Sequence, residues 1–238
     1  MSKFNLGIGL ITKYGMRYKH ATTTTTTTTS ESNVTHTQQL NNESNVTQKQ
    51  QLTDALIIMR MVQIDGFISQ INSYLYIGSI GSAYNHEELI KHNITHIICA
   101  TSKAKEMFTQ TITYYTIDIE DTLQEDITPI LPSFFTFIDS VRINNENHKI
   151  LIHCFQGKSR ASILCIAYMM YCIIRTNHQS DHYNKEDNIR ELFCSTLDIV
   201  RTCRSVACPN DSFRRQIITF FQQQQQQNHL HFLPSSTI

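Results

Sequence analysis

The sequence has no excess of either charge, no closely spaced cysteine pair and no long apolar run. Lys and Arg together number 20, as do Asp and Glu, so no basic surplus points to nucleic acid or an anionic membrane as the main partner. The seven cysteines include no C-x-x-C pair, which argues against a zinc module or a disulfide framework. No apolar run approaches the roughly 20 residues of a membrane-spanning helix, which excludes an integral membrane protein.

Charged residues make up 17% of the chain, because uncharged polar tracts lengthen it. Eight consecutive threonines occupy Thr22–Thr29, and the sequence E-S-N-V-T occurs twice soon after them. Such segments cannot bury enough apolar area to offset an ordering cost of about 1 to 2 kcal/mol per residue. We therefore expect a disordered Thr/Asn/Gln-rich tail at 1–60, a folded domain at 61–221 and a disordered Gln-rich tail at 222–238.

The first 20 residues contain four basic residues and no acidic residue, and threonines follow them. This composition keeps mitochondrial targeting by residues 1–20 open as an alternative, although arginine is scarce and the amphipathic pattern is poor. The cysteine usage favours a reducing compartment, so we expect the protein in the cytoplasm or the nucleus.

Strand and helix signals alternate through the folded domain. Apolar or alternating stretches predict strands at 75–77, 94–100, 115–119 and 149–153. Apolar residues at helical spacing predict helices at 85–92, 128–142, 161–174, 189–203 and 212–221. Thr128 and Pro129 fit the N-cap and first position of the second helix, and the third is apolar on nearly every side, so it should be central and buried. The order predicts an α/β fold with a central mixed, mainly parallel sheet flanked by helices.

The segment His153–Arg160, H-C-F-Q-G-K-S-R, joins a buried strand to the central helix. In such a loop successive backbone N–H groups can point inward, and the helix N-terminus adds a partial positive charge, which together make a site for a dianion. Gly157 provides the freedom for a tight turn, and the guanidinium of Arg160 can bind two phosphate oxygens. Cys154 lies at the entrance to this positive field, which favours its thiolate form. The segment therefore predicts a phosphate-binding loop with a nucleophilic cysteine.

The pattern H-C-x-x-G-x-x-R resembles the signature of the dual-specificity branch of the cysteine-dependent protein phosphatases. The resemblance runs from about Ile71 to Ile218, and its other anchors are Leu75-Tyr76-Ile77-Gly78-Ser79, Ile94-Thr95-His96, Ala167-Tyr168-Met169-Met170, Arg204, Pro209-Asn210, Phe213 and Gln216. It implies hydrolysis of phosphotyrosine and of phosphoserine or phosphothreonine on a phosphorylated protein, through a phosphocysteine intermediate and without a cofactor.

The resemblance also assigns roles to individual residues. Cys154 corresponds to the nucleophile, and the phosphate-binding groups correspond to the Arg160 side chain and the loop N–H groups of Phe155, Gln156, Gly157, Lys158, Ser159 and Arg160. His153 orients the loop and helps to keep the thiolate. The general acid follows a strand about 30 residues before the cysteine. We prefer Asp121 for this role, with Asp118 and Asp126 as rivals, and expect Asp118 to lie within the strand.

Two departures from the family pattern have consequences. Ala161 stands where the family usually has a hydroxyl residue that hydrogen-bonds the thiolate, so a slow or inactive, substrate-trapping phospho-binding protein is an alternative. Residues 177–188 add about a dozen residues to the usual spacing, and we expect a loop insertion far from the chemistry. A second alternative is the same chemistry on a non-protein phosphate ester, although relatives of that kind often carry more basic residues in the loop than Lys158.

Other reactive residues receive structural interpretations. We expect the side chains of four other cysteines to be buried small hydrophobes: Cys99, Cys165, Cys172 and Cys194. Four arginines fit either a site for a phosphorylated partner or a solvated helix face: Arg201, Arg204, Arg214 and Arg215. The eleven histidines show no metal-ligand spacing, so we expect no metal site.

Overall fold

A computed structural model describes residues 65–177 and 186–231, together with residues 50, 53–57, 59–61 and 63. The chain divides after Ile64 into two units. The fold described below is that of the second unit, which begins at Asp65 and contains every element from β1 onward.

Several expectations concern the tails and the insertion. The targeting alternative for residues 1–20 and most of the insertion at 177–188 lie outside the described residues. Residues 53–57 are helical, although we expect disorder up to residue 60. The last helix, α8 (Asp211–His231), continues through the glutamine run past residue 221, where we expect the second tail to begin. Glutamine is a good helix former, so a glutamine run can extend a helix that packing has already nucleated.

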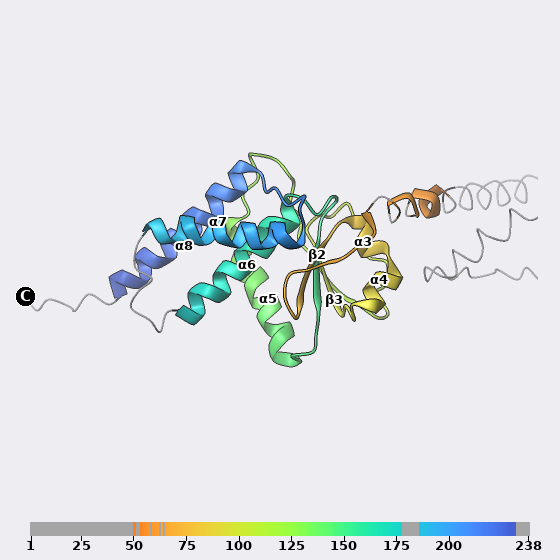
Figure 1. The fold of residues 1–238 in the computed structure, drawn as a ribbon, viewed down its shortest axis with the longest axis horizontal. Helices are drawn as coiled ribbons and strands as arrows, with labels where there is room; N and C mark the ends of the chain where they lie inside the picture. The colour runs from red at the N-terminus through yellow and green to blue at the C-terminus, as the bar shows by residue number, and fades with distance from the viewer. Residues whose placement is uncertain are drawn as a thin grey trace, which may run out of the picture. The chain divides into compact units, whose positions relative to one another are not determined.

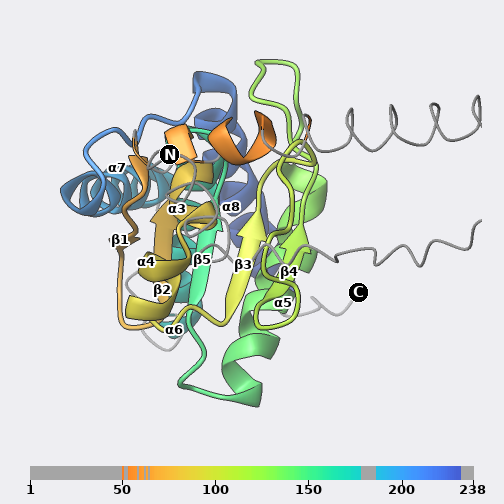
Figure 2. The ribbon, with the colours of Figure 1, turned by 90° about the vertical axis from the view of Figure 1, so that its right-hand side faces the viewer.

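A five-stranded sheet forms the centre of the unit (Figure 2). In sheet order its strands are β1 (Ser69–Gln70), β2 (Leu75–Gly78), β5 (Ile150–His153), β3 (His96–Cys99) and β4 (Thr113–Thr116). β1 pairs with β2 in the antiparallel sense and all the other pairs are parallel. The predicted mixed, mainly parallel sheet is therefore confirmed. Because parallel strands share one direction, the carboxyl ends of β2, β3 and β5 meet at one edge of the sheet, where sites form in such folds.

β4 ends earlier than the sequence predicts. Its neighbour β3 ends at Cys99, and the last hydrogen bond between the two runs from Ile117 N to the Cys99 oxygen at 2.8 Å. Ile117 and Ile119 remain buried beyond the strand, with Asp118 exposed between them. The alternation of apolar and polar residues at 115–119 therefore reflects side-chain burial that continues past the end of β4. Asp118 lies after the strand, so the expectation that it lies within it is wrong.

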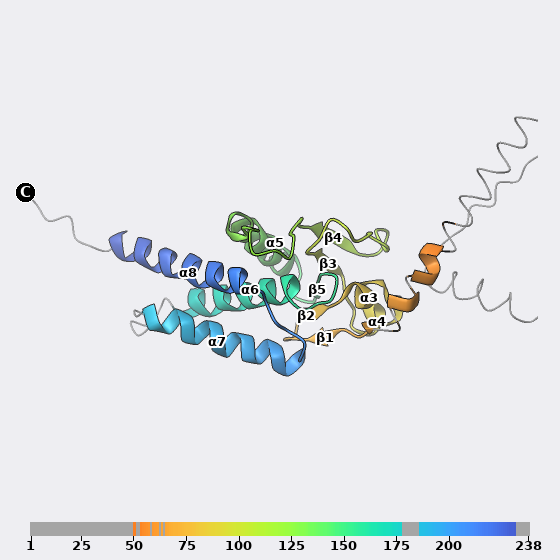
Figure 3. The same cartoon turned by 90° about the horizontal axis from the view of Figure 1, so that it is seen from above.

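Helices cover both faces of the sheet (Figures 2 and 3). The short helices α3 (Ile80–Tyr84) and α4 (His86–Lys91) lie on one face, and the other face carries α5 (Leu131–Asn144), α6 (Arg160–Asn177), α7 (Glu186–Cys203) and α8. α6 packs on β2 and β5 and contacts α5, α7 and α8. α7 and α8 run beside it in Figures 1 and 3. Residues 161–167 of α6 are all buried, which confirms that this helix is central. No helix among the described residues is both long and apolar enough to cross a bilayer.

The helix expected to start at Thr128 begins differently. Residues Thr128–Ile130 form a single 3-10 turn, η1, and α5 starts at Leu131. Thr128 does not act as an N-cap, because its N–H and its hydroxyl both donate to Asp126 Oδ1, at 2.9 and 2.6 Å. Asp126 is instead the acceptor of this turn, as aspartate often is when its side chain bonds the backbone two residues on.

Candidate active site

The loop between β5 and α6 closes around the sulfur of Cys154. This residue is 2% exposed, and the N–H of Gly157 donates to its Sγ at 3.2 Å. Gly157 has a φ of 62°, in the left-handed region that favours glycine. A Cβ at this position would lie 2.4 Å from the carbonyl oxygen of Gly78, so a side chain would push the loop open. The backbone can wrap this closely because residue 157 is glycine.

Arg160, the first residue of α6, brings its guanidinium into the same site. Its side chain is 14% exposed, and Nη1 donates to the Ile119 carbonyl oxygen at 3.2 Å. Its Nε–H is buried and has no hydrogen-bond partner among the described residues; the Asp121 carboxylate lies 4.0 Å away. A buried donor without an acceptor is costly. The guanidinium is therefore suited to an anion that supplies the missing acceptor.

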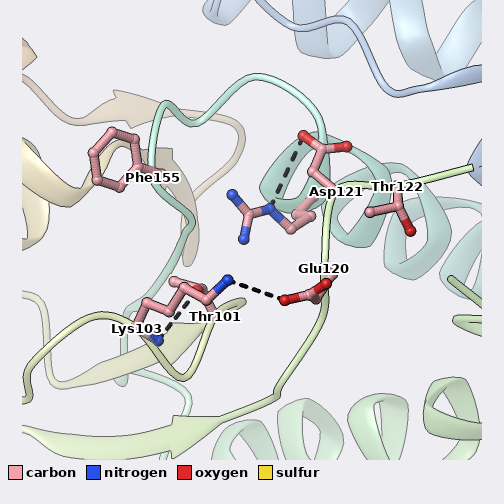
Figure 4. A pocket seen from close by; sticks show the side chains of 7 residues that line it. Thr101, Lys103, Glu120, Asp121, Thr122 and Phe155 are labelled. Atoms are coloured by element: carbon pink, nitrogen blue, oxygen red, sulfur yellow. Dashed lines mark hydrogen bonds and ion pairs between the residues drawn. The ribbon is translucent and has the colours of Figure 1, made fainter.

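A pocket of about 310 Å³ adjoins Arg160 (Figure 4). Its lining residues are Thr101, Lys103, Glu120, Asp121, Thr122, Phe155 and Arg160. Figure 4 shows Phe155 and Asp121 on different sides of this pocket, and the Phe155 side chain is about half exposed. At the margin, Lys103 Nζ pairs with Glu120 Oε1 at 3.0 Å. The pocket thus combines a guanidinium, an aromatic wall and a carboxyl group around one opening.

Asp121 is held at this pocket by groups from two other parts of the chain. Its Oδ1 accepts a hydrogen bond from Ser159 Oγ at 2.7 Å and another from Asn210 Nδ2 at 3.0 Å. The Asn210 N–H in turn donates to Ser159 Oγ at 3.1 Å. The loop between β5 and α6, the loop after β4 and the turn before α8 are therefore joined by one small network.

The two rival carboxyl groups are engaged elsewhere. Asp118 Oδ1 accepts from the backbone N–H and the hydroxyl of Ser102, at 3.3 and 2.5 Å. These hydrogen bonds lower the pKa of Asp118 and hold its carboxylate at Ser102. Asp126 serves the η1 turn. Of the three candidates, Asp121 is the one that lines the pocket.

The family model for the catalytic domain of dual specificity phosphatases matches residues 75–223. The chain belongs to this family. It is 28% identical to dual specificity protein phosphatase 19 of Mus musculus over 153 residues, which cover 64% of this chain and 61% of that protein. It is also 28% identical to dual specificity protein phosphatase 1B of Arabidopsis thaliana over 153 residues, which cover 64% of this chain and 81% of that protein. The match thus spans less than two thirds of the mouse protein's length.

Solved structures of phosphatase domains share the fold. The Yvh1 phosphatase domain from Chaetomium thermophilum has a TM-score of 0.57 and 28% identity, over 66% of this chain and 96% of that one. The human tyrosine phosphatase-like serine/threonine/tyrosine-interacting protein has a TM-score of 0.54 and 27% identity, over 68% of this chain and 97% of that one. The resemblance to the dual specificity phosphatases is thereby confirmed.

His153 is the last residue of β5, and its side chain is buried. Burial lowers its pKa to about 4, so the imidazole is neutral at pH 7. Its Nδ1 lies 3.4 Å from the Cys154 carbonyl oxygen, a contact that fits an orienting role at the start of the loop.

Two other cysteines, Cys99 and Cys165, are also buried. Burial raises the pKa of Cys99 to about 11, and burial also raises the pKa of Cys165, so both are neutral thiols. Cys194 is exposed, and the expectation that it is buried is wrong. α7 buries residues spaced three or four apart, such as Leu192 and Thr196, and Cys194 falls between them.

Sequence reasoning missed part of the pocket lining. Lys103 and Glu120 come from the loops after β3 and β4, where an exposed charged residue carries no distinguishing signal. Asn210 belongs to the Pro209-Asn210 segment that carries part of the family resemblance. Its contact with Asp121, however, depends on how the turn before α8 packs. Among the described residues, no cluster of three or more His, Cys, Asp or Glu side chains could hold a metal ion.

Proposed function

We propose that this chain hydrolyses phosphotyrosine, phosphoserine and phosphothreonine esters of proteins through a phosphocysteine intermediate. One observation carries the proposal: the Gly157 N–H donates to the Cys154 sulfur, and Arg160, at the end of the same loop, has a buried Nε–H without a partner among the described residues. A sulfur nucleophile next to preorganised donors is what attack on a phosphate ester requires. Membership of the dual specificity phosphatases supports protein phosphatase activity.

In the first step, the Cys154 thiolate attacks phosphorus, and the S–P bond forms as the bond from phosphorus to the ester oxygen breaks. The Arg160 guanidinium and the loop N–H groups stabilise the charge on the equatorial oxygens. Asp121 donates a proton to the departing oxygen, because an unprotonated alkoxide is a very poor leaving group.

In the second step, a water molecule attacks the phosphorus of the phosphocysteine. The S–P bond breaks, and the sulfur leaves as a thiolate. The Asp121 carboxylate accepts the proton of the attacking water, which returns the acid to its starting form and releases inorganic phosphate. The position of Asp121 at the pocket supports both of its roles.

A slow, substrate-trapping form of this function is favoured by one observation. Ala161 is fully buried at the start of α6 and carries no hydroxyl to hydrogen-bond the sulfur. The next residue, Ser162, is also buried, and its Oγ has no hydrogen-bond partner among the described residues, so it does not replace that hydroxyl. Without the hydrogen bond the thiolate is a poorer leaving group, and the phosphoenzyme accumulates. One similar structure is that of a protein named phosphatase-like.

Rapid-quench kinetics on p-nitrophenyl phosphate test the enzyme proposal. We expect Cys154→Ser to abolish turnover while the protein stays folded, because a serine alkoxide is inaccessible at neutral pH. The matched control is Cys99→Ser, at the end of the neighbouring strand, where a serine hydroxyl can keep the bond to the Thr101 carbonyl oxygen. Activity of Cys154→Ser within about tenfold of the wild type would overturn the nucleophile assignment.

The same experiment separates fast from trapped turnover. A burst of nitrophenol followed by a slow steady state, together with a higher kcat for Ala161→Ser, supports slow breakdown of the phosphoenzyme. A wild type without a burst, and without gain from Ala161→Ser, overturns the trapping form and leaves ordinary hydrolysis.

A further inference from the structure

Arg204 holds the outer side of the phosphate-binding loop. It follows α7 and is 7% exposed, in contrast to the solvated helix face that the sequence allows. Its Nη2 and Nε donate to the carbonyl oxygens of Gln156 and Gly157, each at 2.8 Å. Because the C=O and N–H of a planar trans peptide point in opposite directions, the N–H groups of Gly157 and Lys158 face away from Arg204. The Gly157 N–H is the one that donates to the Cys154 sulfur.

The two flanking carbonyl groups of the loop are held by backbone donors. The Phe155 oxygen accepts from Ile80 N at 3.2 Å, and the Lys158 oxygen accepts from Cys208 N at 2.7 Å. These bonds do not depend on the identity of a side chain. Arg204 is therefore the side chain that sets the direction of the two central peptide groups.

Gly157 permits this close approach. A Cβ at residue 157 would lie 2.7 Å from both Nε and Nη2 of Arg204, as well as against the Gly78 backbone. A side chain at this position would displace the guanidinium from the two carbonyl oxygens. The glycine thus serves the contact behind the loop as well as the turn itself.

Asp65 supplies the counter-charge to this guanidinium. Its Oδ2 lies 2.5 Å from Arg204 Nη2, although the two residues are 139 positions apart in the chain. The Asp65 carbonyl oxygen accepts from Ser79 Oγ at 2.7 Å, and Ser79 is the N-cap of α3. A buried guanidinium that otherwise bonds only neutral carbonyls is stabilised by such a partner.

We propose that Arg204, held in place by Asp65, is a positioning residue that keeps the loop N–H groups directed at the bound anion. The identity of that anion as a phosphoryl group rests on the proposed function. Arg204 touches none of the reacting atoms and acts through the peptide groups of Gln156 and Gly157. Anion affinity, and not stability alone, should therefore depend on Arg204 and Asp65.

The test uses the full chain and orthovanadate as the probe. Calorimetric titration gives the Kd of Arg204→Lys and Asp65→Asn, and circular dichroism gives their Tm. A lysine has one nitrogen in place of the two fixed donors of the guanidinium, so we expect the Arg204→Lys Kd to rise about tenfold or more, and the Asp65→Asn Kd by a smaller factor. The matched control is Arg201→Lys, whose arginine also bonds a carbonyl oxygen, that of Ala207, beside a carboxylate, that of Asp198. We expect its Kd to be unchanged.

The outcomes distinguish this inference from the proposed function. If Arg204→Lys and Asp65→Asn lower Tm but bind vanadate like the wild type, the ion pair is merely structural and the inference is wrong. If they lose affinity as expected while the wild type binds vanadate but hydrolyses no phosphate ester, the proposed function fails and the inference stands. A wild type that does not bind vanadate overturns both.

Discussion

The two loops that build the site are held in different ways. The loop from Cys154 to Arg160 has its carbonyl oxygens bonded to buried or backbone groups, with Arg204 behind its centre. The loop after β4 buries Ile117 and Ile119, but two of its acidic side chains are held by exposed partners, through the pairs Asp118 with Ser102 and Glu120 with Lys103. The backbone of the first loop is therefore fixed by buried or backbone donors, whereas these two acidic side chains of the second are held by bonds that compete with water.

This difference fits the division of work in the proposed reaction. Donors to a developing charge are effective when they are preorganised, because no reorganisation is then needed during the reaction. A proton donor has to meet leaving groups of different size, and a loop held by weak surface bonds can adjust to them. The comparison implies that changes in the phosphate-binding loop affect every substrate alike. The effect of changes in the loop after β4 (residues 117–122, named the acid loop here) should instead depend on the leaving group.

The largest expected effect is that of Asp121→Asn on phosphotyrosine. Loss of a general acid typically costs about 10² to 10⁴ in rate, and an asparagine cannot donate the proton. p-Nitrophenyl phosphate should lose far less, because its leaving oxygen needs little protonation. Steady-state kcat on both substrates measures the contrast, with Asp118→Asn as the matched control. Equal losses on the two substrates would show that Asp121 is not the acid.

The next largest effect is expected for Arg160→Lys. This variant should lower kcat/KM by about 10² to 10³, because it removes preorganised hydrogen-bond donors to the transition state. Unlike Asp121→Asn, this variant should impair both substrates by a similar factor. The ratio of the two kcat/KM values, compared with the wild type, measures this. A ratio that shifts as strongly as in Asp121→Asn would erase the distinction between the loops.

The burial of the phosphate-binding loop should also appear as a pH dependence of stability. His153 has a pKa of about 4 when folded and about 6.5 when unfolded, so the unfolded chain binds more protons between these values. The free energy of unfolding should therefore fall as pH drops from 6.5 to 4, by about 3 kcal/mol from this residue. Denaturant titrations across this range should show a shallower fall for His153→Gln. Equal pH slopes in both proteins would mean that His153 is not the buried neutral group.

The smallest effect should come from Lys103→Ala, which removes the exposed ion pair with Glu120 at the pocket margin. The two side chains are 76% and 59% exposed, so we expect less than about a fivefold change in kcat/KM, and less still at high salt. Salt titrations of kcat/KM for the variant and the wild type measure it. A change above tenfold would show that the acid loop is as tightly held as the phosphate-binding loop.

The sequence was sufficient for the parts of the molecule that depend on local order. The run from His153 to Arg160, between an apolar strand and an apolar helix, predicts the phosphate-binding loop because its residues are consecutive and its conformation is local. The α/β alternation likewise follows from periods of two and 3.6 residues. The boundaries were less accurate at β4, since the end of a strand depends on where its neighbour ends.

The sequence by itself thus determined the fold class, and it predicts Cys154 as the nucleophile and Arg160 as a phosphate-binding residue, each from neighbouring residues. Only the tertiary structure decided that Asp121, rather than Asp118, lines the pocket, and that Arg204 lies buried behind the loop. The bonds concerned join Asp121 to Asn210, 89 positions away, and Arg204 to Asp65, 139 positions away. Such contacts follow from the packing of helices on a sheet, and no local period or propensity encodes them.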